Sequence, residues 1–373
     1  MVVKNFNAIK RAINKVDPTM GKIFIPWILK HPKSIKTMIK LAKAYKKARR
    51  IRNQDFLDNN LKIPPFIIIS ITSQCNLRCS GCYAAAAGTL CQNSTKKPLA
   101  VEQWEKIIQE SVELGIFGFI IAGGEPFIVQ KLLNLSERFN DRLFIIFTNG
   151  TLLNHNTYKQ LKNLANVIVV VSIEGSNEQT NLRRGCGVYE KAIETIKQLD
   201  KNGNISGISV TINRNNYEYW MNENNIDSLI LDGVRLGFLL EYIPVEGDGE
   251  LMLSQEESKK FREKVLYYRK NKQIFLIHSP GDEEYMGGCV SAGRGFAHIT
   301  PMGDLTPCPV SNIATHNLTK STLREGLESP LFKIIRENEH LLETEGSPCA
   351  LFSHSAEVEA LASKVKAYKT SSY

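Results

Sequence analysis

The stretch Gln74-Cys-Asn-Leu-Arg-Cys-Ser-Gly-Cys-Tyr83 holds three cysteines within eight residues, and it decides how the rest of the chain is interpreted. Cys75, Cys79 and Cys82 directly follow Phe66 to Thr72, an apolar and β-branched run that is typical of a buried strand. Thiolates are the soft ligands that iron–sulfur clusters and zinc prefer, and one short loop can turn three of them inward. The pattern favours an iron–sulfur cluster at the end of a strand, with a zinc knuckle or three buried core thiols as the alternatives.

The spacing Cys-x3-Cys-x2-Cys resembles that of the radical S-adenosylmethionine (SAM) superfamily. A four-iron cluster with three protein ligands keeps one iron open to a chelating molecule, whereas a structural zinc site is closed by four. The resemblance implies that this iron binds SAM, and that an electron cleaves SAM to a 5′-deoxyadenosyl radical that abstracts hydrogen from a substrate. The family often has an aromatic residue just before the third cysteine. This chain has Gly81 there, so Tyr83 is the candidate for shielding the cluster or the adenine.

The whole chain, at 373 residues, is long enough for two or three structural units. Eight cysteines without a secretory signal indicate a reducing cytoplasm, where clustered thiols bind metal instead of forming disulfides. No apolar run approaches the length of a membrane span. We therefore expect a cytoplasmic protein. Cys91 and Cys186 match no motif and are expected to be structural.

Positive charge is concentrated in residues 1–54, which hold 15 Lys and Arg against one Asp. A basic helix is predicted from Pro32 to Asn53, after the apolar run Ile23 to Leu29. The favoured interpretation is a solvated helix that packs its apolar stripe on the main domain; peripheral contact with an anionic membrane surface is the second. Nucleic acid ranks last, because no recognition fold accompanies the charge.

Past residue 60, short β-branched runs alternate with stretches of helical period, which is typical of βα units around a parallel sheet. Strands are predicted near residues 66–72, 117–122, 144–148, 167–173, 207–212 and 234–242, and helices near 101–114, 130–139, 156–164, 187–202, 222–231 and 254–271. The six repeats predict an α/β fold, a partial (β/α)6 TIM-like barrel of the kind that radical SAM enzymes have.

Active sites of such barrels gather at the C-terminal ends of the strands, where this chain carries its unusual residues. Gly123-Gly124-Glu125-Pro126 follows the second strand and is similar to the family motif that holds the SAM amino group. Glycines expose backbone groups, and the carboxylate of Glu125 suits an ammonium ion. Asn149, after the third strand, either contacts SAM or forms a simple turn.

Ser172 and Glu174, after the fourth strand, are similar to the Ser-x-Asp/Glu pair that contacts the ribose of SAM; a polar strand end is the alternative. In the following loop, Arg184 precedes Gly185 as an arginine does in many relatives, where it reaches the SAM carboxylate. We interpret Arg183 as a surface charge.

The sixth strand delivers Glu241 and Tyr242, which either touch the substrate and relay a proton or lie on the rim.

A second cysteine set, Cys289, Cys308 and Cys349, follows the barrel, and a β-hairpin is predicted from Phe296 to Cys308 with its turn at Met302 to Asp304. This resembles the C-terminal extension of SPASM and twitch enzymes, which carries auxiliary iron–sulfur clusters. Relatives supply four or more cysteines there. Three explanations remain open: a fourth ligand from His354, Asp282 or His278, a cluster with an open iron, or a lost cluster with core thiols.

We therefore predict a basic arm over residues 1–60, a radical SAM barrel over 61–275 and a SPASM/twitch-like extension over 276–373. The expected activity is that of a radical SAM oxidoreductase with a [4Fe–4S] cluster, SAM, a second iron–sulfur cluster and a reductant such as flavodoxin or ferredoxin. The expected substrate is a peptide, a protein or a membrane-associated biosynthetic precursor. A non-catalytic iron–sulfur or zinc protein, serving as electron carrier or scaffold, is the alternative.

Overall fold

The computed structural model describes residues 18–90, 97–245, 249–344 and 346–370, and its chain divides into two compact units. Unit 1 comprises residues up to Lys46, Ser136–Tyr242 and Glu250–Ser279, and unit 2 comprises Lys47–Leu135, Ile243–Gly249 and the chain from Pro280 onward. Each unit is assembled from separate segments, whereas the sequence predicts three consecutive domains. Those domain boundaries therefore stay a prediction. Cys91 and the first residues of the basic arm lie outside the described residues.

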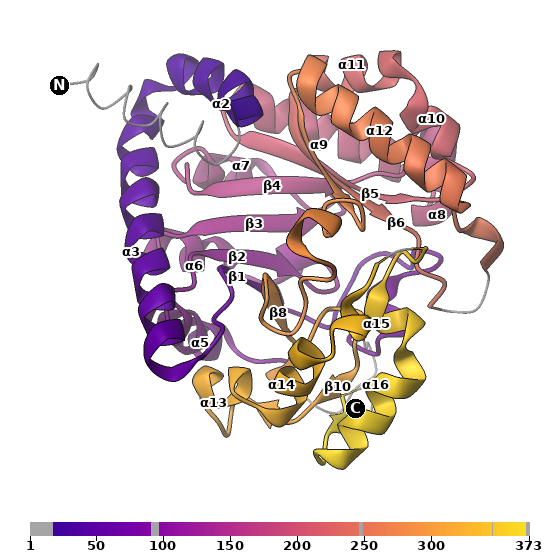
Figure 1. The fold of residues 1–373 in the computed structure, drawn as a ribbon. Helices are drawn as coiled ribbons and strands as arrows, with labels where there is room; N and C mark the ends of the chain where they lie inside the picture. The colour runs from indigo at the N-terminus through magenta and orange to yellow at the C-terminus, as the bar shows by residue number, and fades with distance from the viewer. Residues whose placement is uncertain (1–17, 91–96, 246–248, 345, 371–373) are drawn as a thin grey trace. The chain divides into compact units, whose positions relative to one another are not determined.

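Unit 1 is built on parallel strands that pair in chain order: β3 (Leu143–Thr148), β4 (Val167–Ser172), β5 (Ile205–Ile212), β6 (Val234–Glu241) and β7 (Phe275–Ser279). The helices that follow the strands pack against them (Figure 1). Apolar residues on the inner side of these helices are buried, for example Ala192, Ile196 and Leu199 of α9. These helices are α7 (His155–Leu161), α8 (Asn177–Arg184), α9 (Val188–Asn202), α10 (Tyr217–Met221), α11 (Glu223–Leu231) and α12 (Gln255–Asn271).

Unit 2 holds β1 (Phe66–Ser70), which pairs in parallel with β2 (Gly118–Ala122) on one side and with β8 (Phe296–Ile299) on the other. β8 forms an antiparallel hairpin with β9 (Asp304–Thr306), and β9 pairs with β11 (His316–Asn317). A separate pair joins β10 (Ile313–Ala314) to β12 (Tyr368–Lys369). The predicted hairpin is thus confirmed, and it extends the sheet beside the strand that leads into the first cysteines.

The helices of unit 2 are mostly short. They are α4 (Tyr83–Ala86), α5 (Val101–Glu113), α13 (Leu323–Leu327), α14 (Pro330–Glu337), α15 (Ala350–Ser353) and α16 (Ser355–Lys364). α6 (Leu132–Arg138) follows β2. Single-turn 3₁₀ helices occur at Pro32–Ser34 (η1), Pro126–Ile128 (η2), Gly249–Leu251 (η3), Glu284–Met286 (η4) and Glu339–Leu342 (η5). All six predicted strands and the helices between them are confirmed, as is the α/β fold class.

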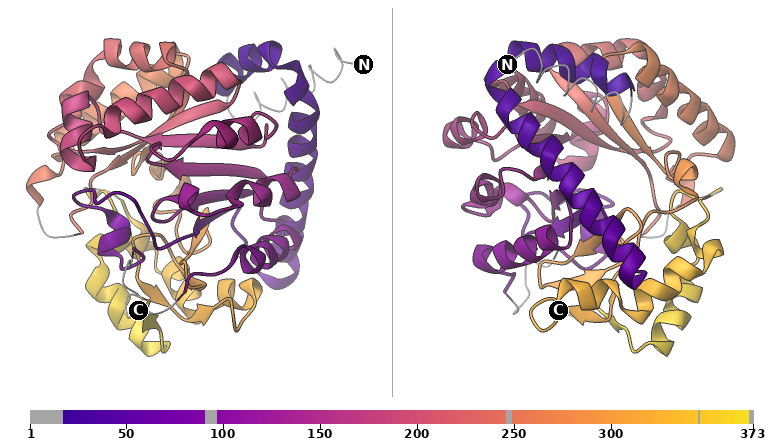
Figure 2. Two further views of the ribbon diagram at one scale, coloured as in Figure 1. Left: turned by 180° about the vertical axis from the view of Figure 1, so that it is seen from behind. Right: turned by 60° about the vertical axis from the view of Figure 1, so that its left-hand side comes forward.

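The basic arm forms two helices, α2 (Pro18–Lys30) and the long α3 (Ile35–Asn59), which Figure 2 shows lengthwise in its right-hand view. Several of their apolar side chains are buried, among them Ile23, Ile28, Leu41 and Ala48, whereas Leu29, Phe56 and Leu57 near the helix ends are exposed. The expected packing of an apolar stripe on the protein is therefore confirmed for these side chains, and whether the other side of the arm is solvated or meets a membrane surface stays a prediction. No helix among the described residues combines the length and apolar character that crossing a bilayer requires.

Candidate functional site

The first three cysteines lie in the loop between β1 and α4, and all three are half-buried. Burial raises the pKa of Cys75, and the negative charges of Glu125, Cys79 and Cys82 raise it further. In the part of the chain that the structure describes, no three His, Cys, Asp or Glu side chains are already gathered as ligands of one ion. The donor set fits an iron–sulfur cluster by chemistry, since three soft thiols lie in one loop and the charges of Cys79 and Cys82 act on Cys75.

The Gly-Gly turn after β2 packs directly on this cysteine loop. The backbone N–H of Gly124 donates to Thr72 O at 2.9 Å, and that of Glu125 donates to Gln74 O at 2.8 Å. A Cβ atom on Gly124 would lie 1.9 Å from Gln74 O, and one on Gly123, whose φ is +128°, would lie 2.6 Å from Thr72 O. Only glycine fits these two positions, so the turn holds the backbone that enters the cysteine loop.

Glu125 is buried, with 1% of its surface exposed. Its Oε1 accepts a hydrogen bond from the backbone N–H of Phe127 at 3.0 Å and thereby caps η2. The same carboxylate is near enough to Cys75 to raise the pKa of that thiol. A buried carboxylate beside three thiols can pair with an ammonium group, which is the role that the resemblance implies; that role stays a prediction.

Tyr83, the first residue of α4, directly follows the third cysteine, and 38% of its surface is exposed. Its shielding role stays a prediction.

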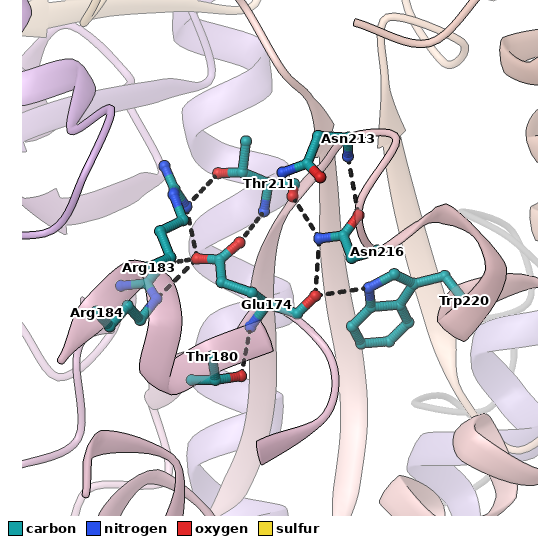
Figure 3. Close-up of polar contacts among 8 residues, drawn as sticks. All are labelled: Glu174, Thr180, Arg183, Arg184, Thr211, Asn213, Asn216 and Trp220. Carbon is teal, nitrogen blue, oxygen red and sulfur yellow. Dashed lines mark hydrogen bonds and ion pairs between the residues drawn. The ribbon is translucent and has the colours of Figure 1, made fainter. Parts of the chain in front are cut away.

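Glu174, just past β4, is the centre of a polar group in unit 1 (Figure 3). Its Oε1 accepts hydrogen bonds from Arg183 Nη1 at 2.5 Å and from Arg184 Nε at 2.7 Å, and its Oε2 accepts one from the backbone N–H of Thr211 at 3.2 Å. Its own N–H donates to Thr180 Oγ1, and its carbonyl accepts from Asn216 and Trp220. Every polar group of Glu174 therefore has a partner within unit 1.

This arrangement changes the roles that the sequence suggested. Arg183 is not a surface charge: its side chain is 18% exposed and also donates to Thr211 Oγ1 at 2.9 Å. Glu174 holds both arginines, which makes it a positioning residue in addition to a candidate contact for the ribose. Two guanidinium groups face one carboxylate, so the group has an excess positive charge that suits a carboxylate ligand.

The sequence reading missed the helix that places these arginines. α8 begins at Asn177 after Ser176, whose side chain and that of Gln179 form a reciprocal capping box. The pattern Ser-x-x-Gln was the signal that could have revealed it. Arg183 and Arg184 lie in the last turn of α8, not in a loop.

Two further predicted SAM contacts have local roles. Asn149 is buried, and its Oδ1 accepts hydrogen bonds from the backbone N–H of Thr151 at 2.9 Å and from the Thr151 hydroxyl at 2.7 Å, which is a turn of the Asx type. Ser172 is the half-buried last residue of β4, in register with Ser209 of β5. Their contacts with a cofactor stay predictions.

Glu241, the last residue of β6, is part of a buried triad. Its Oε1 accepts a hydrogen bond from Ser258 Oγ at 2.6 Å and bonds His278 Nε2 at 2.9 Å. Tyr242, next in the chain, is half-buried, and its N–H donates to Ile212 O. His278, which the sequence suggested as a ligand of a second cluster, belongs instead to this triad in unit 1. A substrate role for Glu241 and Tyr242 stays a prediction.

The second cysteine set lies in unit 2, with Cys289 and Cys308 buried and Cys349 half-buried. Burial raises the pKa of Cys289 to about 12 and that of Cys349 to about 11, and it raises that of Cys308 well above its usual value. The other two thiols add to the rise at Cys308. Three thiols are donors of the type that an iron–sulfur cluster requires.

Glu283, which sequence reasoning did not single out, is the carboxylate whose charge raises the pKa of both Cys289 and Cys349. Of the fourth ligands that the sequence suggested, His354 packs edge-on against the ring of His340 at 5.9 Å.

A buried chain of hydrogen bonds connects β1 to Cys308 through β8 and β9. His298, with none of its surface exposed, bonds Ser70 Oγ through Nε2 at 2.8 Å and Thr306 Oγ1 through Nδ1 at 2.8 Å. The Thr306 hydroxyl donates to Cys308 O at 3.1 Å, so it must accept from Nδ1–H, and Nε2 must accept from Ser70. Burial lowers the pKa of His298 to about 3, which is consistent with this neutral tautomer.

Comparison with known proteins identifies the family of the central part of the chain. Residues 69–222 match the family model described as Radical SAM superfamily. The Fe-coproporphyrin III synthase of Methanosarcina barkeri is 29% identical over 155 residues, which are 41% of this chain and 38% of that protein. This chain thus aligns with about two fifths of that relative. The AdoMet-dependent heme synthase of the same organism is 23% identical over 311 residues, covering 74% of this chain and 86% of that one.

Among solved structures, Streptococcus suis SuiB bound to S-adenosylmethionine has a TM-score of 0.64 at 19% identity and covers 77% of this chain and 71% of its own. SuiB bound to its precursor peptide SuiA gives a TM-score of 0.62 over 82% of this chain and 71% of its own. At this identity the likeness shows a shared fold.

Proposed function

Because this chain belongs to the radical SAM superfamily, whose members use a [4Fe–4S] cluster and SAM, we propose that it holds such a cluster through Cys75, Cys79 and Cys82 and abstracts hydrogen from a peptide substrate. The observation that carries the proposal is the close packing of Gly123 and Gly124 on the backbone of the cysteine loop. This packing joins the loop to Glu125, the candidate partner of the SAM amino group.

When bound, the cluster supplies the electron that cleaves SAM to a 5′-deoxyadenosyl radical. The protein's own residues bind and orient. Glu125 offers a buried carboxylate to an ammonium group, and Arg183 and Arg184, held by Glu174, offer guanidinium groups to a carboxylate. Ser172 and Asn149 are proposed to contact SAM from unit 1, and Tyr83 to cover the cysteine loop.

We assign a second iron–sulfur cluster to Cys289, Cys308 and Cys349. Burial raises the pKa of all three thiols, so binding of a cluster must displace their protons. Iron content separates the two clusters: the Cys289→Ala variant should keep the iron of the first and lose that of the second.

Support for a peptide substrate comes from the fold shared with SuiB, which has been solved with a precursor peptide. A tetrapyrrole substrate is the second candidate, because the heme synthase aligns over 86% of its own length. Adding a synthetic peptide encoded beside the gene, or Fe-coproporphyrin III, to the reduced enzyme should raise SAM consumption for the true substrate class only.

The activity itself is tested with anaerobically reconstituted protein, dithionite and SAM. We expect release of 5′-deoxyadenosine, its loss in Cys79→Ser, and normal release in Cys186→Ser, which changes an exposed cysteine outside both sets. A preparation that contains zinc and no iron, or one that binds iron and releases no 5′-deoxyadenosine, would favour the scaffold or electron-carrier alternative.

A further inference from the structure

One side of α3 is a dense row of exposed cations. Within residues 36–50, seven basic side chains are exposed, and here they are called the cationic face: Lys36, Lys40, Lys43, Lys46, Lys47, Arg49 and Arg50. Successive steps of three and four residues connect Lys36, Lys40, Lys43, Lys47 and Arg50, so these five follow one side of the helix. The helix is seen lengthwise in Figure 2 (right).

Few negative side chains of the protein balance the positive charge of the cationic face. The sequence contains no Asp or Glu from residue 18 to residue 54. Among the described residues, the ion pairs of the protein involve none of these seven cations, and Lys40 donates instead to the neutral Asn140 Oδ1 at 3.1 Å. Like charges three and four residues apart destabilise a helix. An anionic partner that covers the row would reduce this repulsion.

Most of the apolar side of the arm is already buried within the protein, and its exposed large apolar side chains lie near the ends of α2 and α3. Leu41, Ala44 and Ala48 of α3 are at most 8% exposed, and Ile23 and Ile28 of α2 are at most 4% exposed. An amphipathic helix that enters a bilayer needs its apolar side free. α3 therefore cannot insert without leaving its place in the fold, and any contact made by its cationic face is electrostatic.

We propose that the cationic face docks the protein on a membrane surface rich in anionic phospholipid, as a peripheral contact without insertion. The row from Lys36 to Arg50 lies within one helix, Ile35–Asn59, and spans about 21 Å of it at about 1.5 Å per residue. Five of the seven cations are lysines, whose flexible point charges suit mobile headgroups better than the rigid arginine forks that fix single phosphates. The proposal uses no property of the SAM site and stands apart from the proposed function.

The test is sedimentation of the full-length reconstituted protein with vesicles of phosphatidylcholine alone or mixed with phosphatidylglycerol. We expect binding to the anionic vesicles only, and its loss at high salt, because the attraction is screened. The variant K36Q/K43Q/K47Q/R50Q removes four charges of the face and should weaken binding about a thousandfold, because each charge contributes roughly 1 kcal/mol. A deletion of the arm is unsuitable, because it would remove buried residues.

The matched control is K162Q/K201Q/K320Q/K364Q, which removes the same charge from exposed lysines on other elements. It should bind as the unchanged protein does. Iron content and circular dichroism check that both variants fold. Equal weakening in the two variants, binding to neutral vesicles, or a cationic-face variant that still sediments would overturn the proposal. So would competition by duplex RNA or polyglutamate at lower concentration than the vesicles, since the face would then fit another polyanion.

Discussion

The polar group around Glu174 and the loop of Cys75, Cys79 and Cys82 both follow parallel strands, yet they carry opposite charge. At Glu174, two guanidinium groups surround one carboxylate, and every polar atom of that glutamate is bonded within the protein. At the cysteine loop, a carboxylate and three thiols come from neighbouring turns, and burial together with the charges of Glu125, Cys79 and Cys82 raises the pKa of Cys75. In the first group the carboxylate is fully paired and positive charge is left over, whereas in the second the thiols are donors that suit a metal. In the folded protein Glu174 already holds both arginines, and the thiols are the donors that would bind a metal.

The largest effect is expected when the ion pairs of Glu174 are broken. Glu174→Gln leaves Arg183 and Arg184 facing each other in a mostly buried place, and we expect the free energy of unfolding to fall by about 3 kcal/mol. Urea unfolding of the metal-free protein measures it. Glu256→Gln, which breaks an exposed pair with Lys260, is the control and should leave the transition unchanged. An equal response of the two variants would contradict a buried charge group.

The next effect concerns the cysteine loop. Gly124→Ala forces a Cβ against Gln74 O, so either the turn or the loop must shift, and we expect a loss of about 2 kcal/mol together with loss of the first cluster's iron. Gly187→Ala is a useful comparison, because nothing lies near its Cβ position, so any effect there comes from its positive φ of +78° and not from a clash. It should keep its iron. Full iron content in Gly124→Ala would show that the turn does not hold the loop.

The buried His298 makes stability depend on pH in unit 2. Its pKa is lowered in the folded protein, so the unfolded chain binds the proton more readily, and stability is lost as pH falls below the ordinary value of histidine towards about 3. Between pH 6.5 and pH 5 the loss should be about 2 kcal/mol in the metal-free protein. His298→Gln should flatten this dependence. A variant with the same slope as the unchanged protein would place the titrating group elsewhere.

The smallest effect distinguishes the role of Arg183 from that of Arg184. Lysine keeps the charge and loses the planar fork, so Arg183→Lys should lose the shared bonds to Glu174 and Thr211 at a cost of about 1 kcal/mol. If Arg184 alone reaches SAM, Arg184→Lys should raise the KM for SAM while Arg183→Lys changes stability only. A higher KM in both variants would assign the whole cationic group to SAM.

Local patterns predicted most of the fold correctly. Periodicity located the six strands and their helices, and the turn at Met302 to Asp304 located the β8–β9 hairpin. α8 was missed, although Ser176 and Gln179 carry its capping signal. β7 was missed as well. Its register with β6 depends on pairing across the length of α12, which no local pattern contains.

Local spacing was enough to predict three thiols in one loop after a strand, a Gly-Gly turn after the next strand, and a basic arm with an apolar stripe. The partners that those groups meet became clear only from the folded chain. It paired Arg183 with Glu174, connected His298 to both Ser70 and Thr306, and buried the apolar side of α3 while leaving its cations exposed. The difference arises from the distance along the chain over which each effect acts. Propensity and spacing act over a few residues, whereas burial and charge pairing are set by segments that chain folding brings together.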